Sequence, residues 1–292
     1  MFRVRIIQAL LCAVATLQVI AADPTFLCRH VADIQPTQAD LTTATAHYKP
    51  IFSIGDPDQQ QLKSIARYGE LTVDPGGSTE TVSYPAEEQI YFVLEGTGVL
   101  LYDSQKYPIK RDDFMYLPVD IRHGAANASS TPLRLLVMGF KIPDGLQVPP
   151  TQKLMLANVD DVELRQLAGH GSTSQFKLLM GSTTARPDRH KLATTNTVIE
   201  MFIIDFSPGG TNIPHHHDTA EEIYYVLRGH GDMVAGGGAD GNEGRYASRE
   251  GDAYFFRLNA TVGFHSGSKA GEEHDLVLAV RSKYPFSRER NR

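Results

Sequence analysis

Short apolar runs separated by turn residues dominate the chain from about residue 51 onward. The run from Ile90 to Leu94, which is rich in β-branched and aromatic residues, is one example. Runs of this length and composition predict β-strands. Few windows show the i, i+3, i+4 spacing of a long helix, and residues 159–167 are the best helical candidate. The pattern therefore predicts an all-β protein, with this short helix between two strand-rich regions.

One segment of the chain occurs twice at a constant offset of 133 residues. Ala86–Gly96 in the first copy faces Thr219–Gly229 in the second without a gap. A period of this length indicates a duplicated domain, because solenoid repeats have periods of about 20–50 residues. We therefore expect two β-rich domains of similar size.

The first two dozen residues differ from the rest of the chain. Arg3 and Arg5 precede a mostly apolar stretch that ends in Ala21 and Ala22. This three-part pattern is typical of a secretory signal peptide, and its apolar core is shorter than the about 20 residues of a spanning helix. We expect a secreted or periplasmic protein without a membrane span. The expected order is a signal peptide over 1–22, an N-terminal arm without clear period over 23–48, a first domain over 49–147, a linker over 148–175 and a second domain over 176–286.

Charge and cysteine content exclude two classes of function. The chain has 28 Lys and Arg against 34 Asp and Glu, a formal net charge of -6, and no basic run. Nucleic-acid binding needs concentrated positive charge to neutralise phosphates, so no nucleic-acid partner is expected. Two cysteines, Cys12 and Cys28, are too few for a four-cysteine zinc site.

Three consecutive histidines, His215 to His217, are the clearest candidate for chemistry. Alternate side chains of a strand point to the same face, so His215 and His217 would share one. Glu221 and Glu222 follow four and five residues after His217. Two imidazoles and a carboxylate form a mixed nitrogen and oxygen site, which suits one divalent transition metal such as Fe, Mn, Ni, Cu or Zn.

At these residues the sequence resembles the cupin superfamily, and specifically a two-domain bicupin. The first motif of that family has two histidines, a glutamate and flanking glycines, and the residues that fit it at every spacing are Gly209, His215, His217, Glu222 and Gly229. The motif selects Glu222 as the ligand rather than its neighbour. The resemblance implies two tandem jelly-roll β-barrels, each a closed double sheet, with the metal ligands pointing into the second.

The second motif of the family normally supplies another histidine, and here the second domain departs from it. Val262 stands where the histidine is expected, and His265 follows three residues later. If the preceding turn is longer by an odd number of residues, His265 points inward as the fourth ligand. If the register is ungapped, His265 points outward and the metal has three protein ligands. We expect His265 inside.

The first domain departs in the complementary way. Val82, Tyr84 and Gln89 stand at the positions of the three ligands, whereas His123 of the second motif is kept. We expect this barrel to keep the fold without the metal. A small-ligand pocket lined by Tyr84, Gln89 and His123 is the alternative.

Two classes of function follow from the resemblance. The first is a secreted metalloenzyme, either dioxygenase-like or using Lewis-acid chemistry, that acts on a small organic substrate in the second barrel. The second is a non-catalytic ligand-binding or storage-type bicupin with a structural metal. No catalytic acid or base can be named from the sequence, and both classes are compatible with a homo-oligomer.

Overall fold

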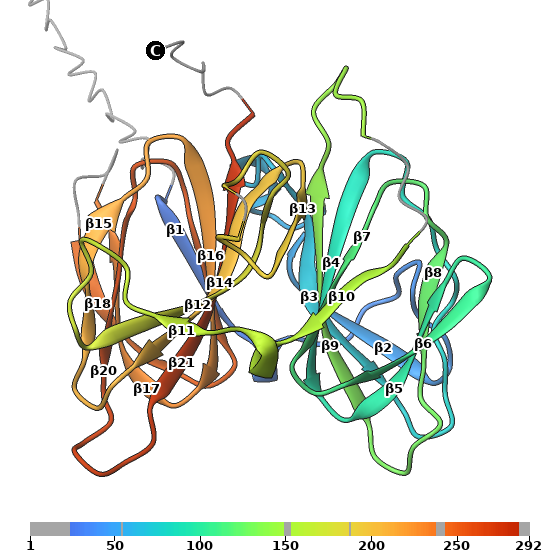
Figure 1. Cartoon of the computed structure of the whole chain (residues 1–292), viewed down its shortest axis with the longest axis horizontal. Coiled ribbons are helices and arrows are strands. Elements are labelled where there is room, and N and C mark those ends of the chain that lie inside the picture. The colour runs from blue at the N-terminus through green and yellow to red at the C-terminus, as the bar shows by residue number, and fades with distance from the viewer. Residues whose placement is uncertain (1–23, 54, 149–152, 187, 238–242, 286–292) are drawn as a thin grey trace, which may run out of the picture.

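The computed structural model describes residues 24–53, 55–148, 153–186, 188–237 and 243–285 (Figure 1). Within them the regular elements are β-strands and three short 3-10 turns, so the predicted all-β class is confirmed. The expected signal peptide over 1–22 lies outside the described residues. No helix in the described part has the length and apolar character needed to cross a membrane.

The first half of the molecule consists of two sheets. A six-stranded sheet has the order β10-β7-β4-β9-β3-β2, and a three-stranded sheet has the order β6-β5-β8. The strands are β2 (Ala46–Ser53), β3 (Ile65–Val73), β4 (Glu87–Glu95), β5 (Thr97–Tyr102), β6 (Gln105–Lys110), β7 (Asp113–Leu117), β8 (His123–Ala126), β9 (Leu133–Lys141) and β10 (Met155–Asn158).

The second half repeats this arrangement. An eight-stranded sheet has the order β1-β19-β16-β21-β14-β12-β11, with β13 added beside β12, and a four-stranded sheet has the order β15-β20-β17-β18. The strands are β1 (Phe26–His30), β11 (Leu164–Arg165), β12 (Ser174–Ser182), β13 (Leu192–Thr195), β14 (Val198–Phe206), β15 (Thr211–His216), β16 (Ala220–Arg228), β17 (His230–Gly236), β18 (Glu243–Arg249), β19 (Asp252–Phe256), β20 (Thr261–Ser266) and β21 (Asp275–Lys283).

The expected jelly-roll halves are present, but neither closes into a continuous hydrogen-bonded barrel among the described residues. Each half is two facing sheets with an apolar interior between them. The larger sheet of each half is also buried on its other face, which explains why β4 and β16 read as unbroken apolar runs. In β4, Tyr91 and Val93 face the interior of the first half, whereas Ile90 and Phe92 face the second half.

The two halves exchange their leading strands. β1, which precedes the first half in the chain, pairs antiparallel with β19 of the second half, with Phe26 opposite Phe256. β10, which precedes the second half, pairs in the same way with β7 of the first half, with Asn158 opposite Asp113. Figure 1 shows the blue β1 among the strands of the second half. The expected N-terminal arm over 23–48 therefore contains a strand, whose partner lies more than 220 residues away in the chain.

The helix expected over 159–167 is also absent. A 3-10 turn at Val159–Asp161 is followed by the short strand β11 at Leu164–Arg165. The side chain of Asn158 caps the turn by accepting a hydrogen bond from the Asp160 N–H. Val159 and Val162 are buried against the interface, and their spacing of three residues matches one turn of 3-10 helix.

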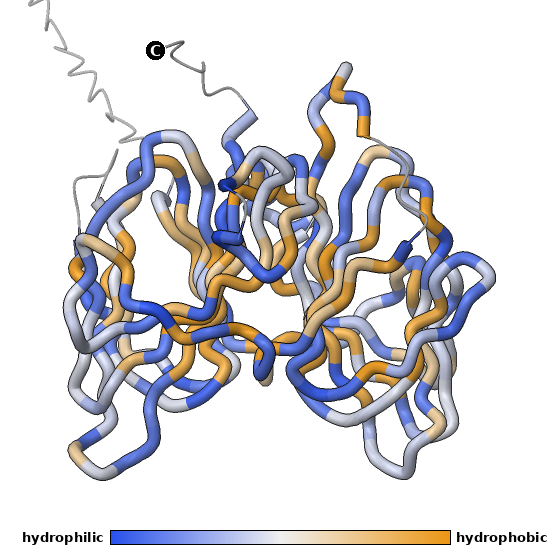
Figure 2. Tube along the Cα trace, viewed as in Figure 1, coloured by the Kyte–Doolittle hydropathy of each residue, from blue (hydrophilic) through white to orange (hydrophobic). Residues whose placement is uncertain are grey.

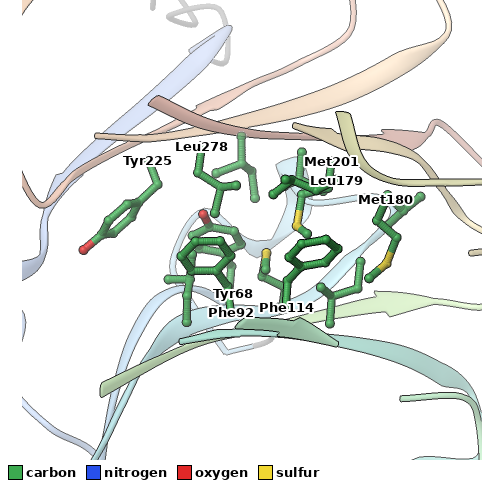
Figure 3. Close-up of a cluster of buried hydrophobic side chains, with 14 of the residues drawn as sticks. Tyr68, Phe92, Phe114, Leu179, Met180, Met201, Tyr225 and Leu278 are labelled. Atoms are coloured by element: carbon green, nitrogen blue, oxygen red, sulfur yellow. The ribbon is translucent and has the colours of Figure 1, made fainter. Parts of the chain in front are cut away.

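Apolar side chains from the larger sheets of both halves form a continuous core between them (Figure 3). Figure 2 colours the trace by hydropathy and shows hydrophobic positions where the two halves meet. The close-up in Figure 3 labels Tyr68, Phe92 and Phe114 of the first half opposite Leu179, Met180, Met201, Tyr225 and Leu278 of the second. Each side chain of this size contributes about 1.5–3 kcal/mol when it is fully buried. The halves are therefore held together mainly by apolar burial.

Two buried carboxylates cross this interface in opposite directions. Glu88 of β4 accepts hydrogen bonds from the backbone N–H groups of Asn196 at 2.8 Å, Thr197 at 2.8 Å and Val198 at 2.9 Å in the other half. Glu221 of β16 accepts from the N–H groups of Lys63 at 2.9 Å and Ser64 at 2.8 Å. The offset of 133 residues that relates Glu88 to Glu221 also relates the donors Lys63 and Ser64 to Asn196 and Thr197. The same interaction is therefore made twice.

We predict that Glu88→Gln destabilises the chain strongly. Glu88 is 0% exposed, and an amide there would turn an NH₂ group toward backbone donors and leave at least one of them without an acceptor. The expected loss is about 3 kcal/mol in the free energy of unfolding, measured by urea denaturation. The matched control is Glu273→Gln, whose side chain is 81% exposed and whose change should stay within about 0.5 kcal/mol. Equal stability of the two variants would contradict the role assigned to Glu88.

Candidate metal centre

Three side chains of the second half converge between its two sheets. His215 lies on β15, His217 follows it, and Glu222 lies on β16 of the facing sheet. Their ligand atoms all lie within 4.8 Å of one another. The register of β15 against β20 shifts between Asn212 and His215. Because of this irregularity, Asn212 and His215 both face the interior of the half. His215 therefore points toward the other two candidate ligands, as its spacing predicted.

The chemistry of the donor atoms fits a metal ion. Nε2 of His217 and Oε2 of Glu222 are 3.1 Å apart, yet neither atom forms a hydrogen bond with any described residue. A short contact without hydrogen-bond alignment is expected for two ligands of one ion. Nδ1 of His215 lies 2.9 Å from the carbonyl of Ile213, so it donates there and leaves Nε2 with a free lone pair. Such an outer hydrogen bond fixes the tautomer and the ring of a ligating histidine.

The two adjacent glutamates have different environments. Glu222 is 2% exposed and lies with the histidines, whereas Glu221 is 0% exposed and points to the interface between the halves. Successive residues of a strand point to opposite faces, so only one of the pair can reach the histidines. The structure therefore brings together His215, His217 and the glutamate that the motif selected.

His265 does not join this group, and the expectation that it is the fourth ligand is wrong. β20 keeps the ungapped register, with Val262 opposite His215. Val262 and Phe264 are both 0% exposed in the interior of the half. By alternation, His265 between Phe264 and Ser266 points to the outer face, where it pairs in register with Asp232.

A half-buried arginine balances the carboxylates of the site. Nη2 of Arg281 lies 2.9 Å from Oε1 of Glu200, and its Nε lies 3.8 Å from Oε1 of Glu222. Its guanidinium also stacks over the ring of Phe202 at 5.3 Å. Burial acts to raise the pKa of Glu200, but its interactions with His190 and Arg281 outweigh burial and lower this pKa to about 2. The partner of Arg281 is therefore a permanent anion at neutral pH.

A pocket of about 310 Å³ opens over the three candidate ligands. Its walls include Phe202, Tyr224 and Arg281 from the larger sheet, and Leu167 to His170 from the loop that joins β11 and β12. Tyr224 lies in this wall because alternate residues of a strand point to the same face, so it shares a face with Glu222. The loop was missed because no motif marks it, and it falls in the segment expected to be a linker.

The equivalent place in the first half is filled by protein. Val82, Tyr84 and Gln89 occupy the ligand positions, and the guanidinium of Arg67 lies over the ring of Tyr84 at 3.9 Å. Nε of Arg67 is 3.1 Å from Glu87 and its Nη1 is 3.1 Å from Asp40, so these two carboxylates hold the guanidinium beside the positions where a metal would need its ligands. This arrangement supports the expectation that the first half keeps the fold without the metal.

His123 lies beside this filled pocket. It is 1% exposed, and its ring packs edge-on against Tyr91 at 5.5 Å. Nδ1 of His123 lies 2.9 Å from the carbonyl of Ile121, whereas Nε2 forms no hydrogen bond with a described residue. Burial lowers the pKa of His123 to about 4, so this imidazole is neutral in the folded chain at physiological pH.

Two family models match this chain in tandem. Residues 69–139 match the model described as "Cupin domain", and residues 175–258 match the model described as "Cupin". The chain belongs to the cupin family. With two cupin domains in series it is a bicupin, as the duplicated motif predicted.

Individual relatives match this bicupin over short segments. An uncharacterized protein of Methanocaldococcus jannaschii is 31% identical over 71 residues, which are 24% of this chain and 57% of that protein. Germin-like protein 5-1 of Oryza sativa is 38% identical over 71 residues, 24% of this chain and 31% of its own length. Oxalate oxidase GF-2.8 of Triticum aestivum is 42% identical over 65 residues, 22% of this chain and 28% of its own length. The matches thus span about a third to a little over half of these relatives.

Solved structures match the bicupin over most of its length. A putative glyoxylate-induced protein from Pseudomonas aeruginosa has a TM-score of 0.69 at 15% identity, covering 92% of this chain and 94% of that one. A structure concerned with the Mn(II) centres of Bacillus subtilis oxalate decarboxylase has a TM-score of 0.62 at 12% identity, covering 88% and 77%. Identities this low establish the shared fold alone.

We predict that His123 makes stability depend on pH. Its folded pKa of about 4 lies below the ordinary histidine value of about 6.5, so the unfolded chain binds one more proton between these pH values. Its contribution to stability is complete above pH 6.5 and is lost as pH falls toward 4. Between pH 7 and pH 4 the free energy of unfolding, measured by urea denaturation, should therefore fall by about 3 kcal/mol less in His123→Gln than in wild type. His230→Gln, at an exposed histidine, controls for the loss of an imidazole, and parallel pH profiles for His123→Gln and wild type would contradict the prediction.

Proposed function

We propose that this bicupin is a metal-dependent enzyme that acts on a small organic substrate in its second half. The observation that carries the proposal is the convergence of His215, His217 and Glu222, with unpaired donor atoms, on one pocket. Ligand sets of this kind suit a single divalent transition metal, among Fe, Mn, Ni, Cu and Zn. Two histidines and one carboxylate also leave coordination positions open for a substrate.

Bound there, the metal would supply Lewis acidity or, if it is redox-active, the electron transfer needed for dioxygenase-like chemistry. The names of two similar proteins support this range of chemistry: one is an oxalate oxidase, and the other is an oxalate decarboxylase with Mn(II) centres. Both names point toward small organic acids as the first substrates to screen.

The residues of the chain itself would shape and balance the site. The pocket volume of about 310 Å³ is at the lower end for small-molecule sites, which favours a compact substrate. Arg281 is bound by Glu200 and faces Glu222, so its charge offsets those two carboxylates. Asn212 donates a hydrogen bond to the hydroxyl of Tyr224 at 3.2 Å and fixes this ring in the pocket wall.

The N-terminal pattern supports a place of action outside the cytoplasm. A basic start, a short apolar core and small residues at its end are the features by which a translocon selects exported chains. We propose that the protein acts as a secreted or periplasmic enzyme.

We predict that the purified chain binds about one equivalent of metal and that His215→Ala/His217→Ala loses it. The double variant removes two of the three candidate ligands, and neither histidine is in an apolar core cluster, so the fold should survive. Elemental analysis by mass spectrometry measures the stoichiometry, with His216→Ala as the matched control because this exposed histidine lies between the other two and outside the ligand group.

Iron, manganese, nickel or copper that is lost in the double variant would support redox chemistry and direct a screen for oxygen uptake. Zinc alone would favour Lewis-acid chemistry. Metal retained by the double variant would contradict the site assignment. Tight ligand binding without turnover in a metal-loaded chain would favour the second class, a non-catalytic binding or storage bicupin.

A further inference from the structure

The second half lacks the histidine that its second motif should supply, and the loop over 166–171 brings a different one to the same pocket. Val262 takes the motif position opposite His215 and offers no donor atom. His170, from the loop between β11 and β12, lines the pocket together with the three candidate ligands. Its ring centroid lies 6.1 Å from that of His215, at 86° between the planes.

The loop that carries His170 is held in shape by its own hydrogen bonds. The side-chain Nε2 of Gln166 donates to the carbonyl oxygens of His170 and Gly171, both at 2.9 Å. The N–H of His170 donates to the carbonyl of Leu167 at 3.2 Å, and Gly169 takes the positive φ of +84° that the tight turn requires. The position of His170 over the pocket is thus built into the loop.

The imidazole of His170 has a supported ring and free nitrogens. Its ring packs on Phe176 of β12 at 4.6 Å between centroids. No hydrogen bond joins either ring nitrogen to another described residue. The charged groups that face it from the packed elements are Glu200, Glu222 and Arg281, the same groups that surround the candidate ligands.

Distances allow His170 and His215 to share one ion. A metal–nitrogen bond of about 2.1 Å puts an imidazole centroid about 3.2 Å from the ion, so two ligating rings have centroids within about 6.5 Å. The pair His215 and His217 is at 4.9 Å and the pair His170 and His215 at 6.1 Å, both inside this limit. The nitrogens of His170 lie outside the 4.8 Å group, so the imidazole must turn toward it, and no hydrogen bond restrains that rotation.

We propose that His170 is the fourth protein ligand of the metal, in place of the motif histidine that Val262 has replaced. The inference rests on the proposed function, because it concerns the same metal site. His170 would then bind the metal from a loop outside the strands that carry the other ligands. We expect this loop to close one side of the pocket when metal binds.

The test counts imidazoles on Cu(II), used as a spectroscopic probe in the purified chain. Pulsed electron paramagnetic resonance detects the remote nitrogen of each coordinated imidazole. We expect three in wild type and two in His170→Phe, which keeps the aromatic contact with Phe176. The apparent affinity for Cu(II) should fall at least tenfold in this variant, since the loss of even an outer-shell partner costs about that much. His265→Gln is the matched control and should keep three imidazoles, because His265 faces outward.

Two imidazoles in wild type, or an unchanged imidazole count and affinity in His170→Phe, would overturn the assignment of His170. The failure of the proposed function has a different signature. In that case His217→Ala would bind Cu(II) as wild type does, or wild type would show no imidazole-coordinated site. Thermal unfolding of each variant establishes that a loss of binding does not reflect a loss of fold.

Discussion

The register of the two halves against each other depends on one interaction made twice, the burial of a glutamate of each half against backbone N–H groups of the other, inside the apolar core that holds the halves together. Removing a carboxylate from water costs several kcal/mol unless its lone pairs are satisfied. Glu88 and Glu221 are both 0% exposed, and each accepts backbone hydrogen bonds from the opposite half. Within its own half Glu88 accepts in addition from the hydroxyl of Tyr116. The halves must therefore fold against each other. The next residue of each strand faces the pocket of its own half, so this interface also fixes the place of Gln89 and Glu222.

The duplicated fold supports two pockets that take their arginine from different strands. In the first half an arginine, Arg67, lies on β3, and Gly139 faces Gln89 across the strand pair. In the second half Glu200 takes the place of Arg67, and Arg281 faces Glu222. A Cβ atom at Gly139 would lie 2.5 Å from Nε2 of Gln89 and 2.6 Å from Cγ of Arg67. The side chains of Gln89 and Arg67 therefore fill the space over Gly139 in the first pocket. In both pockets one arginine is paired with two carboxylates: Arg67 with Glu87 and Asp40, and Arg281 with Glu200 and Glu222. In the second pocket one of these carboxylates, on Glu222, also lies with two histidines and can bind a cation with them.

Local patterns in the sequence were enough to predict the strands, the duplication and the three converging side chains. These features depend on period-2 alternation and on short fixed spacings. Features that depend on residues distant in sequence were not predicted. These are the pairing of β1 with the second half and the approach of His170 from a loop without a motif. The outward orientation of His265 was not predicted either, because it depends on the length of the preceding turn.

The most direct test of the account is anomalous X-ray diffraction from crystals of the chain loaded with Mn(II), recorded on both sides of the manganese absorption edge. We predict one strong anomalous peak in the second half, bounded by His215, His217 and Glu222. We expect no peak beside Arg67 in the first half. A peak in the first pocket, or an empty second pocket with manganese bound only at the surface, would contradict the conclusion that both halves of this bicupin keep the fold and that the second half binds the metal.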